Sequence, residues 1–392
     1  MKALTWQGRR SVRVEEVADP RIEKPTDAII RVTSSGICGS DLHLYEVLGP
    51  FMRRGDILGH EPMGIVEEVG PEVKRLRVGD RVVVPFNIAC GHCWMCEQGL
   101  FSQCETTQVR EYGSGAAIYG YSVLYGAVPG GQAEYLRVPY ADFGPVQVPK
   151  VGEDERYLYL SDVVPTAWQA VEYAAVPQGG ELVVLGLGPI GQMCARIGRL
   201  RGYHVTAVDP VPERRAMAER HGIAVLDLTD DVAEQLRERT KGRGPDSVVD
   251  AVGMEAHGAP LASTAQKAAG MLPEPLARKA FLTMGVDRLA ALQMAIDVVR
   301  RGGTLSLAGV YGGMRDPLPM LTLFDKQVQL RMGQCNVRRW TDTVLPLLDD
   351  PSDPLGVLDL ATHRVPLAQA PEMYERFQKK EDGCIKVVVA PN

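Results

Sequence analysis

The feature that most constrains this chain is a group of four cysteines within fifteen residues. They follow the spacing C-x2-C-x2-C-x7-C, as Cys90, Cys93, Cys96 and Cys104. A short loop broken by glycine has little hydrophobic core, but four thiolates on it can close a tetrahedron around zinc. Because the protein fills every position, such an ion would be structural. An iron–sulfur cluster also uses four thiolates, but no cysteine is followed by proline and no second cluster appears, which favours zinc.

Charge and length exclude several classes of protein. The net charge of −6 over 392 residues gives no electrostatic footprint for nucleic acid or an anionic membrane. No apolar stretch approaches the roughly 18 to 20 residues that span a bilayer. The N-terminus lacks a basic segment followed by an apolar one, so no signal peptide is indicated. Clustered cysteines in a reducing compartment indicate metal binding. We therefore predict a cytoplasmic protein.

The secondary-structure pattern changes twice along the chain. Residues 1–165 contain short valine-rich strands between glycine, proline and aspartate turns. In residues 166–334, strands such as Glu181–Leu187 and His204–Val208 alternate with helices, and residues 335–392 return to irregular and β structure. Alternating strands and helices predict a doubly wound parallel sheet. The expected fold class is thus α/β, with a Rossmann domain inserted between two segments of a β-rich catalytic domain.

A glycine-rich turn, G-L-G-P-I-G at residues 186–191, follows a strand and opens a helix. This motif alone is weak evidence, but the strand and helix beside it meet the context it requires. The first glycine permits the tight turn, the second lets the backbone approach a pyrophosphate, and the third lets helix and strand pack closely. The predicted dinucleotide contacts here are Gly186, Gly188, Pro189, Ile190 and Gly191.

An acidic residue indicates which dinucleotide binds. Asp209 lies eighteen residues beyond Gly191, at the end of the next strand. A carboxylate there accepts hydrogen bonds from ribose hydroxyls and repels a 2′-phosphate, which favours NAD over NADP. Arg214, five residues further on, is a second cofactor candidate and could bind a phosphate.

Two motifs upstream supply ligands for a second zinc. The first is G-I-C-G-S-D-L-H at residues 36–43, and the second is G-H-E-P-M-G at residues 59–64. Cys38 and His60 are donors that suit zinc. A catalytic zinc needs about three protein ligands and one open position.

These motifs, in this order, resemble the zinc-containing medium-chain alcohol dehydrogenase family over nearly the whole chain. The resemblance implies a GroES-like fold for the β-rich domain, with Cys38 and His60 on catalytic zinc. It places Glu61 behind the metal, near enough to approach it during ligand exchange. Asp41 is expected to orient His60 from behind.

The third zinc ligand departs from the best-known members, which have a cysteine just before the threonine that contacts nicotinamide. Here the sequence is Leu-Ser-Asp-Val-Val-Pro-Thr, so Asp162 takes the place of that cysteine and Thr166 is the threonine. This pattern is similar to the glutathione-independent formaldehyde dehydrogenase and formaldehyde dismutase branch. A helix N-cap without metal is the alternative role for Asp162. The family relay implies that Ser40 takes the substrate proton, which passes through the nicotinamide ribose to His43.

Further cofactor contacts follow from the same resemblance. They are Gly39, Ser40, His43, Thr166, Val252 and Gln334. Almost fifty residues separate Gly253 from Gly302, more than one helix needs, and residues 254–288 form an apparent insertion. In the formaldehyde dehydrogenase branch, an insertion covers the adenine half of the cofactor; a surface elaboration or an oligomer contact is the alternative.

The resemblance implies an enzyme with two zinc ions and NAD, which transfers hydride between an alcohol, or a hydrated aldehyde, and the nicotinamide. An aldehyde dismutase with tightly bound NAD and a polyol or L-threonine dehydrogenase stay open as alternatives. A zinc-free quinone reductase-like or binding protein is the alternative from another class, and the metal-ligand set opposes it. The family also implies a homo-oligomer, either a dimer or a tetramer with the tetramer favoured, often pairing near Gly303–Tyr311.

Overall fold

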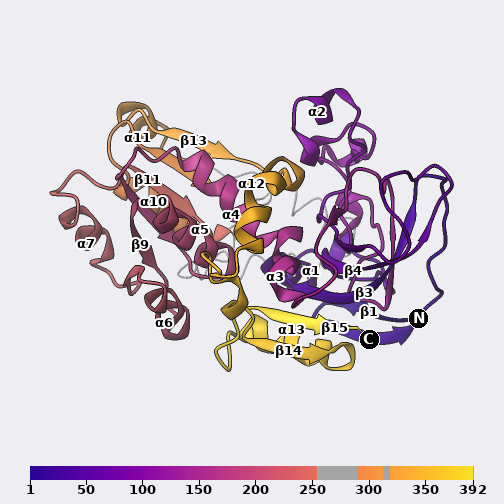
Figure 1. The fold of residues 1–392 in the computed structure, drawn as a ribbon. Coiled ribbons are helices and arrows are strands. Elements are labelled where there is room, and N and C mark those ends of the chain that lie inside the picture. Colours follow the sequence, from indigo (N-terminus) through magenta and orange to yellow (C-terminus); the bar gives the residue numbers. More distant parts are fainter. Residues whose placement is uncertain (254–288, 312–317, 392) are drawn as a thin grey trace. The chain divides into compact units, whose positions relative to one another are not determined.

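The chain forms two compact units in a computed structural model that describes residues 1–253, 289–311 and 318–391 (Figure 1). The first unit comprises Met1–Pro165 and Cys335–Asn392, and the second comprises Thr166–Gln334. The insertion inferred at residues 254–288 lies outside the described residues. Within the described part of the chain, no helix has the length and apolar character needed to cross a membrane.

The first unit is built on a largely antiparallel seven-stranded sheet. Its order is β14-β15-β3-β4-β5-β7, with β6 also paired to β3, and a separate hairpin joins β1 to β2. Buried valines, isoleucines and leucines of β3 to β6 form its core. The strands are β1 (Lys2–Gly8), β2 (Ser11–Glu16), β3 (Ala28–Ile37), β4 (Glu61–Val69), β5 (Arg81–Val83), β6 (Tyr135–Val138), β7 (Val146–Gln147), β14 (His363–Pro366) and β15 (Val387–Ala390).

Helices and short 3-10 turns connect these strands. The α-helices are α1 (Gly39–Glu46), α2 (Trp94–Glu97), α3 (Glu155–Leu158), α12 (Val337–Asp349) and α13 (Ala370–Lys379). The 3-10 helices are η1 (Gly49–Phe51), η2 (Phe101–Gln103), η3 (Arg110–Tyr112), η4 (Val123–Tyr125), η5 (Tyr159–Ser161), η7 (Val357–Asp359) and η8 (Leu367–Gln369). The boundary between the units falls within α4 (Val163–Ala174).

Antiparallel pairing brings the two upstream motifs together. The end of β3 lies opposite the start of β4, with Gly36 paired to Glu61. Cys38 follows β3 directly and His60 precedes β4 directly, so both lie at the same end of the sheet. On the other side of β3, Val387 of β15 pairs with Ile37. This register places Lys386 beside the same end.

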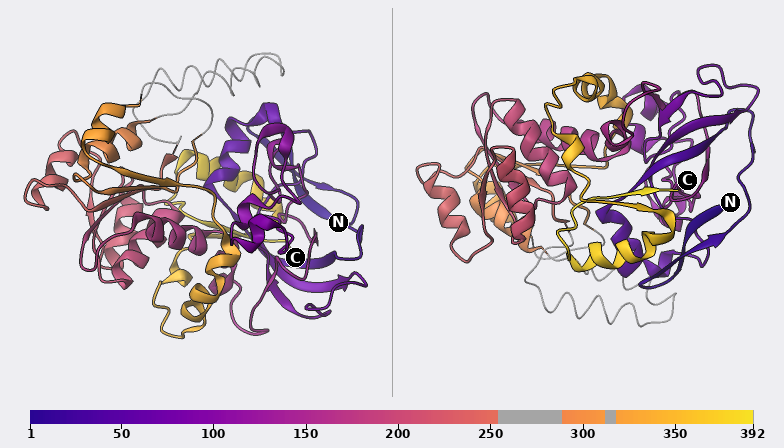
Figure 2. Two further views of the ribbon diagram at one scale, coloured as in Figure 1. Left: turned by 90° about the horizontal axis from the view of Figure 1, so that it is seen from above. Right: turned by 60° about the horizontal axis from the view of Figure 1, so that its bottom comes forward.

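The second unit is a six-stranded sheet of order β10-β9-β8-β11-β12-β13, in which every pair is parallel. Helices cover both faces of this sheet (Figure 2). The predicted doubly wound sheet is therefore confirmed. Its elements are β8 (Glu181–Leu185), α5 (Pro189–Leu200), β9 (His204–Val208), α6 (Pro212–Arg220), β10 (Ala224–Leu226), α7 (Val232–Glu238), β11 (Ser247–Asp250), α10 (Ala290–Val298), β12 (Thr304–Leu307), α11 (Met320–Asp325) and β13 (Gln329–Met332).

One strand was missing from the sequence expectation. All four residues of β13 are exposed, so the strand shows neither an apolar run nor an alternation of buried and exposed positions. It is recognised only by its parallel pairing with β12. The segment Gly303–Tyr311, expected to pair subunits, contains β12, which lies between β11 and β13 inside the sheet.

Candidate functional site

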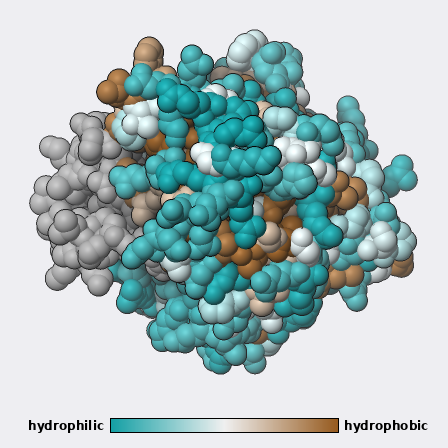
Figure 3. Space-filling model, turned by 90° about the vertical axis from the view of Figure 1, so that its left-hand side faces the viewer, coloured by the Kyte–Doolittle hydropathy of each residue, from teal (hydrophilic) through white to brown (hydrophobic). Residues whose placement is uncertain are grey.

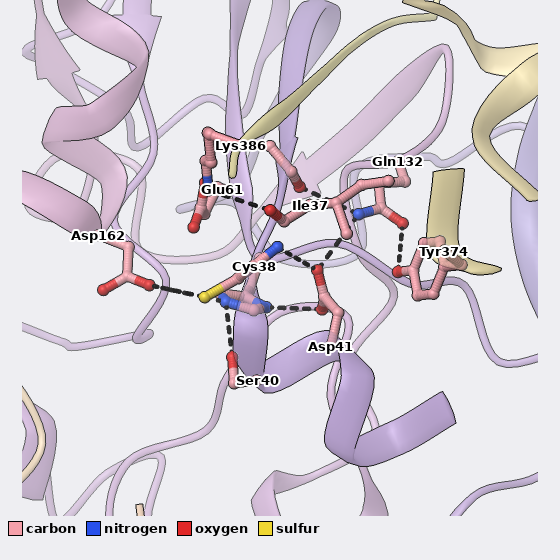
Figure 4. Close-up of polar contacts among 11 residues, drawn as sticks. Ile37, Cys38, Ser40, Asp41, Glu61, Gln132, Asp162, Tyr374 and Lys386 are labelled. Atoms are coloured by element: carbon pink, nitrogen blue, oxygen red, sulfur yellow. Dashed lines mark hydrogen bonds and ion pairs between the residues drawn. The ribbon is translucent and has the colours of Figure 1, made fainter. Parts of the chain in front are cut away.

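Four potential metal ligands converge at the end of the first unit's sheet, as the sequence motifs predict. The donor atoms of Cys38, His60, Glu61 and Asp162 all lie within 4.8 Å of one another. The Asp162 carboxylate Oδ2 lies 3.6 Å from Cys38 Sγ and 3.7 Å from His60 Nε2. Figure 4 shows Asp162 pointing toward Cys38 from the opposite side of the cluster to Asp41. Asp162 stands between η5 and α4, with its carboxylate in the cluster.

These separations fit a single tetrahedral ion. Zinc bonds of about 2.3 Å to sulfur and about 2.0–2.1 Å to nitrogen or oxygen set neighbouring donors roughly 3.3–3.6 Å apart. Burial, with the carboxylates of Glu61 and Asp162, raises the pKa of the Cys38 thiol to about 11. A pocket that concentrates anionic donors in this way suits a divalent cation. Cys38, His60 and Asp162 could therefore hold zinc.

Asp41 lies behind His60, on the side away from Asp162. Its Oδ1 is 3.0 Å from His60 Nδ1, and its Oδ2 accepts a hydrogen bond from the Cys38 backbone N–H at 3.0 Å. Burial disfavours the charged form of His60, but Asp41 and Asp162 outweigh it and raise the pKa of His60 well above its ordinary value. The contact at Nδ1 leaves Nε2 facing the cluster.

Glu61 forms a buried ion pair with Lys386, and both side chains are fully buried. Lys386 Nζ also donates to the Ile37 carbonyl at 3.2 Å. A Cβ at Gly36 would lie 1.9 Å from Glu61 Oε2, so only glycine fits at the start of the first motif. The pair holds the Glu61 carboxylate beside the metal ligands.

The cysteine quartet closes into a second cluster. Its sulfur atoms also lie within 4.8 Å of one another, with Cys90 to Cys96 at 4.0 Å and Cys93 to Cys104 at 3.8 Å. Zn–S bonds of about 2.3 Å give a tetrahedral edge of about 3.8 Å, which matches. The Thr106 hydroxyl donates to Cys90 Sγ at 3.2 Å. The quartet thus fits one metal ion and no larger cluster.

In the second unit, the glycine turn has the backbone that a dinucleotide requires. Gly186 follows β8 with φ +86°, in the region that favours glycine. A Cβ at Gly191 would lie 1.8 Å from the Gly186 carbonyl oxygen, whereas a Cβ at Gly188 would meet nothing within 4 Å. Pro189 and Ile190 form the first turn of α5, and no side chain caps that helix. Its N–H groups are therefore available to a pyrophosphate.

Asp209 is nearly fully buried at the end of β9. It fixes the glycine turn, because its Oδ2 accepts a hydrogen bond from the Leu187 N–H at 2.7 Å, and its Oδ1 accepts one from the Val211 N–H at 2.7 Å. Arg214 of α6 lies 3.7 Å from the Asp209 carboxylate. Asp209, predicted to bind the ribose, and Arg214, the second cofactor candidate, therefore lie side by side.

The remaining predicted cofactor residues are divided between the units. Gly39, Ser40 and His43 belong to α1 in the first unit, and the Ser40 hydroxyl is 3.2 Å from His60 Nε2. Thr166, Val252 and Gln334 belong to the second unit. Val252 lies against the turn, since its Cγ2 is 2.7 Å from where a Cβ of Gly186 would stand. Gln334 accepts a hydrogen bond at its carbonyl from Gln169 at 3.1 Å.

Sequence reasoning missed three buried side chains beside the cluster. They are Gln132, Tyr374 and Lys386, drawn with the ligands in Figure 4. Each lies thirty or more positions from the nearest of these ligands in the sequence, and none stands in a motif. Only the tertiary fold of the first unit brings them there, with Tyr374 on α13, Gln132 before β6 and Lys386 before β15.

Comparisons with known proteins match both units. The family model described as the alcohol dehydrogenase GroES-like domain matches residues 24–150, and that described as zinc-binding dehydrogenase matches residues 189–271. An uncharacterised zinc-type alcohol dehydrogenase-like protein of Bacillus subtilis is 41% identical over 100% of both chains. Formaldehyde dismutase of Pseudomonas putida is 30% identical, covering 100% of this chain and 98% of its own.

A solved structure of an alcohol dehydrogenase has a similar fold over the whole chain. The alcohol dehydrogenase TADH from Thermus sp. ATN1 superposes with a TM-score of 0.83 at 32% identity, covering 100% of this chain and 99% of its own. The fold and the donor sets define an oxidoreductase that uses zinc and a nicotinamide cofactor. The chain belongs to the zinc-containing medium-chain alcohol dehydrogenase family.

Proposed function

We propose that this enzyme binds two zinc ions per chain and transfers hydride between NAD and a short alcohol or hydrated aldehyde. The observation that carries the proposal is the donor set of Cys38, His60 and Asp162, in which three side chains surround one point. When bound, zinc supplies a Lewis acid toward the substrate oxygen and NAD supplies the hydride acceptor. The cysteine quartet holds the second, structural ion.

We assign the proton chemistry to α1. The Ser40 hydroxyl lies beside His60 Nε2, where it can accept the proton of a substrate hydroxyl. His43, on the same helix, receives the proton before its release. Thr166 helps to orient the nicotinamide, with Gly39, Val252 and Gln334 as further cofactor contacts.

We favour NAD over NADP because of Asp209. A 2′-phosphate would bring its negative charge against a buried carboxylate whose oxygens already accept two backbone N–H groups. Arg214 supplies one nearby positive charge, which is compatible with a ribose hydroxyl. NAD and NADP turnover, measured at equal concentration, should differ strongly in favour of NAD.

The decisive experiment is on Asp162. Purified enzyme should contain two zinc ions per chain by elemental analysis. Asp162→Ser keeps a good helix N-cap but loses a zinc ligand, whereas Asp162→Cys supplies a thiolate. The serine variant should bind the catalytic ion at least about 100-fold more weakly, since loss of an outer-shell partner alone costs about 10–100-fold. The cysteine variant should keep two ions.

Full zinc content in the serine variant would show that Asp162 is not a ligand.

An aldehyde dismutase is the second candidate, supported by the full-length similarity to formaldehyde dismutase. Incubation with formaldehyde and no added NAD separates the two activities. A dismutase with bound NAD forms methanol and formate in equal amounts, whereas a dehydrogenase stops after the bound cofactor is reduced. Assays with polyols and with L-threonine, in the presence of added NAD, test the remaining alternative, a polyol or L-threonine dehydrogenase.

We also propose that the enzyme is a homo-oligomer, and we favour a tetramer. The edge strand β13 is exposed along its whole length, and Met320, Leu321 and Phe324 of α11 are 65%, 73% and 80% exposed. Figure 3 shows exposed hydrophobic side chains near the top of the face it draws, the level at which α11 lies in Figure 1. A second copy adding its own β13 would cover this edge.

A further inference from the structure

A line of hydrogen-bonding groups extends from His60 to the C-terminal helix α13. The Tyr374 hydroxyl donates to Gln132 Oε1 at 2.8 Å, and Gln132 Nε2 donates to the Gly36 carbonyl at 3.0 Å and to Asp41 Oδ2 at 3.4 Å. Asp41 Oδ1 then faces His60 Nδ1 at 3.0 Å. Figure 4 shows Gln132 lying between Tyr374 and Asp41. Tyr374, Gln132 and Asp41 are fully buried.

The chemistry of these groups fixes the direction of the line. The Gly36 carbonyl and the Asp41 carboxylate only accept hydrogen bonds, so the amide nitrogen of Gln132 must face them. Its oxygen then faces Tyr374, whose hydroxyl must donate. Burial raises the pKa of Tyr374 well above its ordinary value, which keeps the phenol protonated for this purpose. A flipped amide would set its oxygen against two acceptors.

The backbone holds Gln132 close to the metal ligand. Its N–H donates to the Leu58 carbonyl at 2.9 Å, and its carbonyl accepts from Leu4 at 2.8 Å. Gly59, directly before His60, has φ +98°, and a Cβ there would lie 2.6 Å from the Gln132 backbone nitrogen. Gly59, the first glycine of the second motif, is therefore required because the Gln132 backbone approaches it so closely.

We infer that Gln132 and Tyr374 are positioning residues for the catalytic metal, acting through Asp41 on His60. Tyr374 selects one orientation of the Gln132 amide, and that amide holds Asp41 in place at His60 Nδ1. A firmly held Asp41 keeps Nε2 aimed at the metal, which slows the loss of the ion. The inference rests on the proposed zinc site at Cys38, His60 and Asp162.

The test measures how fast a chelator removes the catalytic ion from the purified enzyme. Tyr374→Phe removes only the hydroxyl, and Gln132→Met removes the amide at similar volume. We expect release to quicken about 3- to 10-fold in the first variant and about 10-fold or more in the second, the scale set by outer-shell partners. Visible absorption of the cobalt-substituted enzyme should shift in both variants. Tyr45→Phe is the matched control, because its ring packs 5.6 Å from that of Tyr374 outside this line.

The double variant tests the order of the line. If Tyr374 acts through Gln132, then Tyr374→Phe adds nothing in the Gln132→Met background. If the two substitutions instead have additive effects on the logarithm of the release rate, Tyr374 does not act through Gln132 and the inference is wrong. It is also wrong if Tyr374→Phe leaves both the rate of metal release and the cobalt spectrum equal to those of the wild type. Should Gln132→Met fail to fold, Tyr374→Phe decides the matter alone. A wild-type enzyme holding only one ion would instead refute the proposed function, so the two failures are distinguishable.

Discussion

At the scale of single residues, the pair formed by Glu61 and Lys386 connects the sequence motif to the interior of the first unit. Neither side chain reaches solvent. No side chain larger than that of glycine fits at Gly36, because Glu61 occupies the space beside it. A buried charge without its partner is costly, more so than the pair itself is stabilising. Lys386 thus allows an anionic group to stay behind the metal ligands.

Lys386→Met should therefore lower the free energy of unfolding of the first unit by about 3–5 kcal/mol, because it leaves the Glu61 charge buried and unpaired. Urea denaturation followed by tryptophan fluorescence measures the effect. Lys379→Met is the control, since Lys379 pairs with Glu375 on the surface of α13. Equal shifts of the midpoint in the two variants would contradict the argument.

At the scale of elements, the second unit's sheet is held at its ends by buried or half-buried aspartates. Asp209 joins the end of β9 to the turn after β8. At the other end, Asp246 accepts a hydrogen bond from the Glu181 N–H at 2.8 Å and one from Arg300 Nε at 2.6 Å. These contacts tie the starts of β8 and β11 to the segment before β12, since carboxylates accept backbone N–H groups strongly.

Asp246 should make stability depend on pH. Burial raises the pKa of Asp246, but the Glu181 N–H and Arg300 outweigh it and hold the pKa below the ordinary value of 3.8. The unfolded chain thus binds the proton more tightly, so this contribution is present above pH 3.8 and is lost as the pH falls through the folded pKa.

Asp246→Asn should lower the melting temperature at pH 7, and the difference from wild type should shrink below about pH 4. Differential scanning calorimetry over that range measures both. Asp297→Asn, whose carboxylate is mostly exposed, should change little at any pH. A difference that stays constant down to pH 2 would show that the Asp246 charge contributes nothing.

At the scale of the whole molecule, the potential metal ligands and the glycine turn belong to different units. The first holds both clusters of metal donors, and the second holds the glycine turn. β13 is an exposed edge of the second unit's sheet, and we propose that a second copy of the chain covers it. The tetramer, the cytoplasmic location and the role of residues 254–288 stay predictions.

Leu330→Lys, at the centre of β13, should reduce the molar mass measured by light scattering, because a buried lysine at a subunit contact is destabilising. Leu330 is 46% exposed in the single chain, so the substitution should leave its fold intact. Val151→Lys is the control, at a 79% exposed position in the other unit. An unchanged mass in the Leu330 variant would place the contact elsewhere.

The sequence alone was sufficient for features contained in short segments. The cysteine quartet, the glycine turn and the strand–helix alternation each depend on neighbours a few residues apart, where backbone geometry links spacing directly to shape. The fold class and the family inferred from them are confirmed. The two sets of potential zinc ligands each lie close together, and the zinc ligands and cofactor contacts stay predictions until metal and cofactor binding are measured.

Tertiary structure decided the rest. The side chain of Asp162 meets Cys38 from 124 positions away, Lys386 meets Glu61 from 325, and Tyr374 meets Gln132 from 242. The contact of Lys386 with Glu61 depends on the register of β3 with β15 and with β4. Asp162 lies between η5 and α4 and Tyr374 lies on α13, so the other two contacts depend on where these segments pack in the first unit, which no local pattern encodes. The cysteine spacing predicts a metal site, whereas the tertiary fold determined which buried side chains lie behind Cys38, His60 and Asp162. The physical reason is that a shift of one residue in register turns every side chain to the other face of the sheet.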